Sequence, residues 1–212
     1  MTEDVKPDLR AARVADTEER IVRAATDLFV ADGYAATTLA AVARAAGVGA
    51  RTVYVRFGTK AALLKRVVDV AIVGDTALVD VAGRDWFAVA TTAPTVAERI
   101  AAVTAASRDI MLRAGGVLAV AQQAESIEPL VGTAAQAGRE ATLANFRTFW
   151  STMDKDGLLP AGADVEWLVR TTGTLCAADT FLLHARMHGH TPAEYGAWLE
   201  TTLRRLIPAS VA

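Results

Sequence analysis

Apolar side chains near the N-terminus recur every three or four positions, which is the spacing of an amphipathic helix. Those that share one face are Ile21, Ala24, Ala25, Leu28 and Phe29. Asp16 and Thr17 favour the start of a helix, and Gly33 follows the run where a left-handed cap residue is common. The pattern predicts a helix over residues 17–32, preceded by a flexible arm at residues 1–16.

Two shorter helices are predicted directly after it, over residues 38–46 and 49–57. Their inward-facing positions are Leu39, Val42, Ala43, Val53 and Phe57. A tight turn at Gly47 joins the two helices. Two short helices joined by a glycine turn have the spacing of a helix-turn-helix, whose second helix enters the major groove of DNA. A plain pair of packed helices is the alternative at this point.

The rest of the chain also follows the helical period and has no alternating apolar run of the kind that forms a strand. The expected helices span residues 60–81, 94–113, 117–127, 129–155 (or 133–155), 164–187 and 191–207. Gly115 and Gly116 are expected to separate the second of these from the third. Thr191, Pro192 and Glu194 predict a capping box at the start of the last. The sequence therefore predicts an all-α protein.

Charge is unevenly distributed along the chain, although the net charge is only −2. Residues 10–66 carry a formal charge of +5, whereas residues 67–212 carry −5. A basic N-terminal part on an acidic body indicates contact with phosphate at one end of the molecule. A chance fluctuation of composition is the alternative explanation.

Composition and motifs argue against several other classes of protein. Cys176 is the only cysteine, which excludes a disulfide framework and a cysteine-based zinc site and fits a reducing cytosol. We find no signal-peptide pattern, and charged residues interrupt every apolar stretch before it reaches membrane-spanning length. The common catalytic, phosphate-binding and dinucleotide-binding motifs are also absent. We expect a cytoplasmic protein without membrane contact, enzyme activity or cofactor. The alternative is a small-molecule-binding helical protein, or an enzyme, without DNA activity.

Residues 28–64 resemble the N-terminal domain of the TetR family of repressors. The matching positions are Leu28, Phe29, Gly33, Tyr34, Thr37, Thr38, Ala43, Ala46, Gly47, Val48, Tyr54, Phe57, Lys60 and Leu63. The resemblance implies a three-helix helix-turn-helix DNA-binding domain at residues 17–62. It also implies a larger C-terminal helical domain at residues 63–212, which binds a ligand and dimerises.

The resemblance assigns roles on DNA to seven residues. They are Thr38, Ala50, Arg51, Thr52, Tyr54, Arg56 and Lys60. The three at positions 50–52 open the second helix of the motif, where base readers are expected. The other four are expected to contact phosphate. Gly49 departs from the serine or threonine that is common in the family, so no hydroxyl remains there to bond a phosphate.

The family's last two helices form a dimer interface, which implies a homodimer here. The interface candidates are Leu168, Thr172, Leu175, Asp179, Leu182, Trp198, Leu199, Thr202 and Leu206. Their spacing also fits the core of a single protomer, and the pattern alone does not decide between the two. A dimer would place two recognition helices on a palindromic double-stranded operator.

The family's middle helices enclose a ligand pocket, and this part of the chain is rich in aromatic residues. The pocket candidates are Trp86, Phe87, Met111, Gln122, Phe146, Phe149, Trp150, Trp167 and Cys176. An aromatic stripe of this kind is more often core than ligand site. The apolar character predicts a small hydrophobic effector, whose binding releases the repressor from DNA through the fourth helix.

Three histidines lie close together near the C-terminus. His184 and His188 are four residues apart on one predicted helix, with His190 just beyond. Two histidines at that spacing can share a metal ion. A third ligand of suitable spacing is not evident from the sequence, and we predict no metal site.

Overall fold

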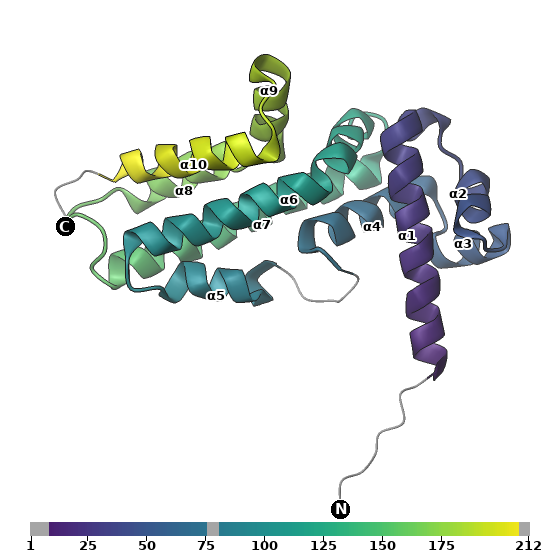
Figure 1. The fold of residues 1–212 in the computed structure, drawn as a ribbon, viewed down its shortest axis with the longest axis horizontal. Coiled ribbons are helices and arrows are strands. Elements are labelled where there is room, and N and C mark those ends of the chain that lie inside the picture. The colour runs from purple at the N-terminus through teal and green to yellow at the C-terminus, as the bar shows by residue number, and fades with distance from the viewer. Residues whose placement is uncertain (1–8, 76–80, 208–212) are drawn as a thin grey trace, which may run out of the picture.

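The computed structural model describes residues 9–75 and 81–207, which form ten α-helices and no strand (Figure 1). They are α1 (Leu9–Ala36), α2 (Leu39–Ala46), α3 (Ala50–Phe57), α4 (Lys60–Val73), α5 (Asp85–Thr92), α6 (Val96–Ala124), α7 (Pro129–Lys155), α8 (Val165–Leu175), α9 (Ala178–His188) and α10 (Pro192–Leu206), with a 3-10 turn at Val81–Gly83. The prediction of an all-α protein is confirmed. The long helices α6 and α7 run along the body, and α1–α3 occupy one end.

The first helix begins earlier than the sequence pattern predicts. It starts at Leu9, so the second half of the arm expected at residues 1–16 is helical; residues 1–8 lie outside the described part. Thr17 was expected near the start of the helix, but its Oγ1 donates to the carbonyl of Arg13 at 2.8 Å, which places it inside the helix. The alanine-rich segment before it has high helix propensity and extends the helix towards the N-terminus.

Gly33 kinks α1 where the sequence predicted the helix to end, and the helix resumes beyond the kink as far as Ala36. Its φ of 79° and ψ of 174° form a backbone conformation that only glycine adopts readily. The Thr37 hydroxyl donates to the carbonyls of Gly33 at 2.8 Å and Leu28 at 3.1 Å, which ties the following turn back to the helix. The kink thereby fixes the direction in which the chain enters α2.

The fourth helix is shorter than predicted, and the sixth is longer. Gly74, with φ of 97°, ends α4 well before position 81. The helix α6 continues through Gly115 and Gly116 without a break. A Cβ at position 115 would lie 2.9 Å from the ring of Phe181, and one at 116 would lie 3.1 Å from Val30. The glycines therefore permit close packing, and the predicted interruption is wrong.

The long helix predicted over residues 164–187 is two helices, α8 and α9. Ala177 is extended between them, and α9 stands away from the direction of α8 (Figure 1). The Thr180 hydroxyl donates to the carbonyl of Thr174 at 2.6 Å, and the Tyr195 hydroxyl donates to that of Leu175. These side chains satisfy carbonyls at the end of α8 that an unbroken helix would satisfy itself.

Two apolar clusters hold the described helices together. The first combines α1–α4 with the end of α6 and the start of α7, including Ala121 and Val131. The second lies among α5–α10 around Phe149 and Trp150. The N-terminal helices are therefore packed directly onto the α6–α7 corner of the body.

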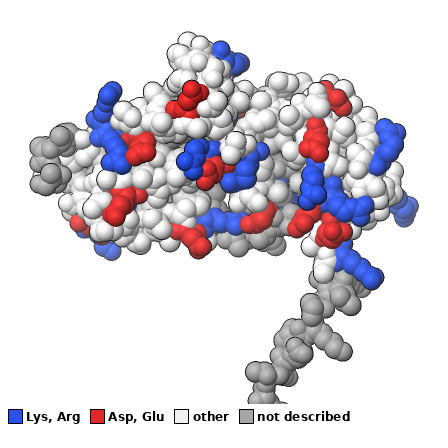
Figure 2. Space-filling view, in the orientation of Figure 1, with Lys and Arg blue, Asp and Glu red and all other residues white. Residues whose placement is uncertain are grey.

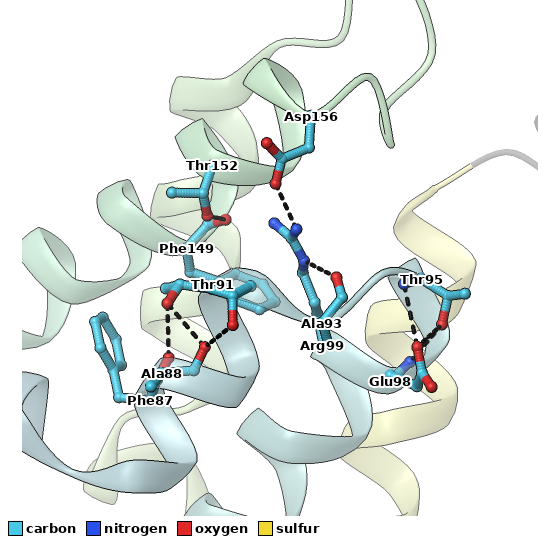
Figure 3. Close-up of polar contacts among 11 residues, drawn as sticks. Phe87, Ala88, Thr91, Ala93, Thr95, Glu98, Arg99, Phe149, Thr152 and Asp156 are labelled. Carbon is cyan, nitrogen blue, oxygen red and sulfur yellow. Dashed lines mark hydrogen bonds and ion pairs between the residues drawn. The ribbon is translucent and has the colours of Figure 1, made fainter.

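A buried arginine fixes the far end of the body (Figure 3). Arg99 in α6 is 2% exposed; its Nε donates to the carbonyl of Ala93 at 2.7 Å, and its Nη2 pairs with Asp156. Beside it, Thr95 and Glu98 form the capping box that starts α6. The guanidinium thus links the end of α5 to the end of α7.

Candidate functional site

The structure forms a helix-turn-helix from α2, Gly47 and α3. Gly47 is left-handed with φ of 64°, and its N–H bonds to carbonyls of the last turn of α2. The Arg20 guanidinium donates to the carbonyls of Ala46 at 2.6 Å and Gly47 at 3.1 Å. A Cβ at position 47 would approach the same guanidinium to 3.0 Å. Both the backbone conformation and the close contact therefore favour glycine at the turn.

The outer face of α3 carries the three predicted base-reading positions. Ala50, Arg51 and Thr52 are exposed, while Val53 on the opposite side is fully buried. Arg51 makes no hydrogen bond or ion pair with any residue that the structure describes. A free guanidinium at the start of a recognition helix can give two hydrogen bonds to guanine. Tyr54, one turn later, is 53% exposed.

The start of α2 also faces outwards. Thr38 is exposed, and its Oγ1 accepts a hydrogen bond from the Ala41 N–H at 3.1 Å as the N-cap of the helix. By contrast, Gly49 caps α3 without a side-chain hydrogen bond. The backbone N–H groups at such helix starts favour anions.

Lys60, at the start of α4, is held by the end of α1. Its Nζ donates to the carbonyls of Tyr34 at 2.6 Å and Ala35 at 3.3 Å and lies 4.2 Å from the centre of the Tyr34 ring. An ammonium group has three N–H donors, so one remains for a phosphate.

Arg56 has an intramolecular partner that the sequence did not indicate. Its guanidinium pairs with Glu18, and Arg66 bonds the other carboxylate oxygen at 2.7 Å. Burial alone would raise the pKa of the Glu18 carboxyl, but the hydrogen bonds and charges of Arg56 and Arg66 lower it. Arg56 therefore joins α3 to α1, whereas the sequence predicted a phosphate contact.

The sequence pattern did not identify two exposed residues that lie beside the predicted DNA contacts of α2 and α3. Val55 is 76% exposed on α3, and Arg44 is exposed in the last turn of α2 without a polar partner among the described residues. The exposure of Val55 could have been predicted from the helical period, because Val55 lies four positions after Arg51 and opposite the buried Val53.

At the outer edge of this end of the molecule, the charged side chains visible in Figure 2 are Lys and Arg.

A cavity of about 550 Å³ lies in the body. Residues of α4–α9 line it, and its size is typical of sites for drug-sized molecules. Seven of the nine pocket candidates line it, namely Trp86, Phe87, Met111, Gln122, Phe146, Phe149 and Cys176. The lining also includes Leu64 of α4 and Val131 of α7, which belong to the apolar cluster of the N-terminal helices.

The other two candidates lie outside the cavity lining. Trp150 is fully buried, and its Nε1 donates to the Thr172 hydroxyl at 3.0 Å. Trp167 is 47% exposed on α8. Trp150 is thus part of the core, and Trp167 part of the surface.

Four of the five charged side chains in the described lining of the cavity form ion pairs, and the fifth, Asp179, accepts a hydrogen bond from the Gln122 amide at 2.6 Å. Lys65 bonds Asp69 at 2.7 Å, and Arg139 bonds Glu125 at 3.3 Å. Burial raises the pKa of the Cys176 thiol to about 12, against the opposing effect of a hydrogen bond with Ser107. The thiol stays neutral, so the described lining offers an incoming molecule neither an unpaired cation nor a thiolate.

Three of the predicted interface residues are buried within the protomer. Leu168, Thr172 and Leu199 are at most 4% exposed and belong to its own core. The candidates Leu175, Leu182, Trp198, Thr202 and Leu206 are partly exposed, and Asp179 is exposed. The large apolar side chains exposed on α8 and α9 are instead Trp167, Leu183 and Met187.

None of the described helices is long and apolar enough to cross a membrane.

Comparisons with known proteins give a consistent result. Residues 21–67 match the model of the N-terminal domain of "Bacterial regulatory proteins, tetR family". Over nearly its whole length the chain is similar in fold to NalD, described as the secondary repressor of the MexAB-OprM multidrug efflux pump in Pseudomonas aeruginosa. The identity is 20%, the coverage is 92% of this chain and 97% of NalD, and the TM-score is 0.65.

Two further solved structures share the fold. The protein SmeT, solved as a complex with triclosan, is 19% identical over 92% of this chain and 94% of its own, with a TM-score of 0.72. The TetR family transcriptional regulator PfmR from Thermus thermophilus is 19% identical over 89% of this chain and 97% of its own, with a TM-score of 0.61. No curated protein sequence matches the chain.

Proposed function

We propose that the chain is a cytoplasmic, ligand-responsive repressor of the TetR type without enzyme activity, because residues 21–67 match the model of the tetR family of bacterial regulatory proteins and the chain is similar in fold to the repressor NalD. The observation that carries the proposal is the outer face of α3, with a free Arg51 beside exposed Thr52 and Tyr54. We assign residues 17–62 to DNA binding and residues 63–212 to ligand binding and dimerisation.

On operator DNA, Arg51 and Thr52 read base edges, and Ala50 lets the start of α3 approach the groove. Thr38, Tyr54 and Lys60 contact phosphates. The ion pair with Glu18 makes Arg56 chiefly a residue that orients α3, and its phosphate contact is secondary. Arg44 supplies further positive charge beside the groove.

The active form is a homodimer on a palindromic operator. A single recognition helix reads few bases, and two half-sites raise both affinity and specificity. Leu183 and Met187, four positions apart on α9, form an exposed apolar face that supports an interface with a second copy, because contiguous exposed apolar surface often marks such a contact. Replacing Met187 by Glu should convert the dimer to a monomer in analytical ultracentrifugation, and a Val89→Glu control on α5 should not.

The effector is a small, neutral, apolar molecule. The aromatic walls of the cavity and the lack of an unpaired cation in its described lining support this assignment, since an ionic group of the ligand without a partner would be costly to bury there. The triclosan bound by SmeT is a molecule of this kind. No cluster of unpaired cations in the described lining would suit a phosphorylated ligand.

The wall of the cavity reaches the apolar cluster of the N-terminal helices, which supports coupling between the cavity and the DNA-binding unit. Leu64 of α4 lines the cavity and also packs among the N-terminal helices. A ligand that shifts α4 would change the spacing of the two recognition helices in the dimer. The ligand can shift the dimer from the DNA-binding spacing to the released one only as far as its affinities for these two states differ.

A panel of neutral aromatic compounds, beginning with triclosan, tests the ligand response. Compounds that raise the unfolding midpoint should lower the affinity for the DNA flanking the gene. Replacing Ala135 in the cavity lining by Trp should abolish both effects. An Ala137→Trp variant, outside that lining, should preserve them. Ligands that bind the cavity but leave DNA affinity unchanged would favour a small-molecule-binding protein without DNA regulation.

A further inference from the structure

The three histidines of the chain meet at the corner between α9 and α10. His184 and His188 lie on α9, and Gly189, left-handed with φ of 67°, turns the chain back after the helix. His190 is thereby returned to the same side as His184. The distances between ring centres are 5.3 Å for 184–188, 5.4 Å for 184–190 and 5.3 Å for 188–190.

This nearly equilateral triangle has the dimensions of a histidine metal site. Imidazole nitrogens bind Zn²⁺ at about 2.0–2.1 Å, so at tetrahedral angles two such nitrogens lie about 3.3 Å apart and their ring centres about 5.3 Å apart. The Nδ1 atoms of His184 and His190 are 3.3 Å apart and share a hydrogen bond, whose proton an incoming ion would displace. Two of the three rings thus already present nitrogens at the separation that a shared ion requires.

The third ring needs only a change of orientation. As the side chains stand, no three metal-binding groups converge on one point in the described residues. His188 is exposed and makes no hydrogen bond with a described residue, so its ring can turn. Rotation about the Cβ–Cγ bond of His188 changes where its ring nitrogens point. It leaves the ring centre almost in place, because the axis of that bond passes close to the centre of the ring. The triangle of centres is therefore compatible with the bound geometry.

The surroundings favour a fixed site over three loose side chains. The ring of Trp198 lies 4.0 Å from that of His184, and Tyr195 lies 5.5 Å away, so α10 supports one side of the cluster. All three candidate ligands are imidazoles. No thiolate joins them, because Cys176 is buried at the cavity. Imidazole ligands suit Zn²⁺, Ni²⁺ and Cu²⁺, whereas Mg²⁺ and Ca²⁺ prefer oxygen.

We propose that His184, His188 and His190 bind one divalent transition-metal ion, with Zn²⁺ as the representative. The spacing in the sequence indicated only the first two ligands; the turn at Gly189 supplies the third. The ion would tie α9 to the start of the turn into α10, outside the DNA-binding surface and the cavity lining. The site does not depend on the proposed repressor function.

Equilibrium dialysis of the full chain against Zn²⁺, with excess Mg²⁺ present, tests the proposal. We expect one ion per chain. The single variants His188→Gln and His190→Gln should each weaken binding by about tenfold or more, because a three-ligand site becomes a two-ligand one. Arg186→Gln, on the same helix, is the matched control and should bind as the parent does. Circular dichroism of each variant checks that the helices remain.

Cobalt provides an independent readout. Co²⁺ bound to the parent chain should give the visible absorption bands of a nitrogen-ligated ion, and these should be lost in a variant that lacks all three histidines. Unchanged Zn²⁺ affinity in folded His190→Gln protein would overturn the three-histidine site. Absence of uptake by the parent, or equal uptake by the triple variant, would also overturn it.

Discussion

The hydroxyl of Tyr34 donates a hydrogen bond of 2.7 Å to Oε1 of Glu128, 94 positions later in the chain. Tyr34 belongs to the helix-turn-helix unit, and Glu128 caps the start of α7 in the body. Burial first, and then the hydrogen bond and charge of Glu128, raise the pKa of Tyr34 well above its usual range. The phenol therefore stays protonated and links the two parts at any physiological pH.

Tyr34→Phe removes this link and keeps the ring. We expect the free energy of unfolding to fall by about 1–3 kcal/mol, because a partly buried hydrogen bond to a carboxylate is lost. Urea denaturation measures the change. Tyr54→Phe is the matched control, since its exposed hydroxyl has no polar partner among the described residues; it should weaken DNA binding and leave stability unchanged. Equal stability of Tyr34→Phe and the parent would contradict the account.

Val55 should contribute to operator binding through its exposed methyl groups. Val55→Ser removes apolar contact with the groove, so operator affinity should fall by about 1 kcal/mol with little effect on folding. Fluorescence anisotropy with labelled operator DNA measures this. Val89→Ser, on the exposed surface of α5, controls for a general effect of losing an exposed valine. Identical operator affinities for the two variants would remove Val55 from the reading face.

The ion pairs of Glu18 should make the N-terminal unit sensitive to acid. Its carboxyl pKa is lowered from its ordinary value of 4.5, so the folded state holds the charged form more favourably than the unfolded state. This contribution is fully present above pH 4.5 and is lost as the pH falls through the lowered pKa. In Glu18→Gln, the loss of stability between pH 5 and pH 3 should be smaller than in the parent, as measured by thermal unfolding. Parallel pH profiles would show that the pair contributes nothing.

Arg99 should be a strong determinant of stability. Arg99→Ala removes a buried side chain and two polar partners, at an expected cost of about 2–4 kcal/mol. Arg99→Met should cost less, because its side chain fills much of the space that alanine leaves empty; both variants remove the Nη1 atom, which is buried without a partner in the described structure. Denaturant titration compares the two. A larger loss for Met than for Ala would contradict this explanation.

Several features of the fold could be predicted from the sequence because their causes are local. The turn at Gly47 and the capping box at Thr191 depend on neighbouring residues, and both predictions are confirmed. The break at Gly33 also lies at the predicted position, although the helix resumes after it. The continuity of α6 was missed, because a glycine that allows Phe181 to approach is indistinguishable in sequence from one that ends a helix.

At the candidate site, too, features with local causes could be predicted and features set by distant residues could not. Exposure of Arg51 follows from the helical period, whereas the partner of Arg56 is 38 residues away in sequence and could not be inferred from spacing. The placement of Trp150 in the core and Trp167 on the surface depends on how α7 and α8 pack together. Long-range packing, rather than residue type, decides these cases.

The most direct test of the central claim is binding of the purified full chain to the DNA flanking its gene at several salt concentrations. Specific binding that weakens steeply with salt is expected, because phosphate contacts release counterions. Arg51→Ala should lower specific affinity by about 1–3 kcal/mol, and Lys60→Ala should also reduce the salt dependence. Arg147→Ala, on the body, should behave as the parent. Affinity no greater than for random DNA, or unchanged specific binding by Arg51→Ala, would contradict the account.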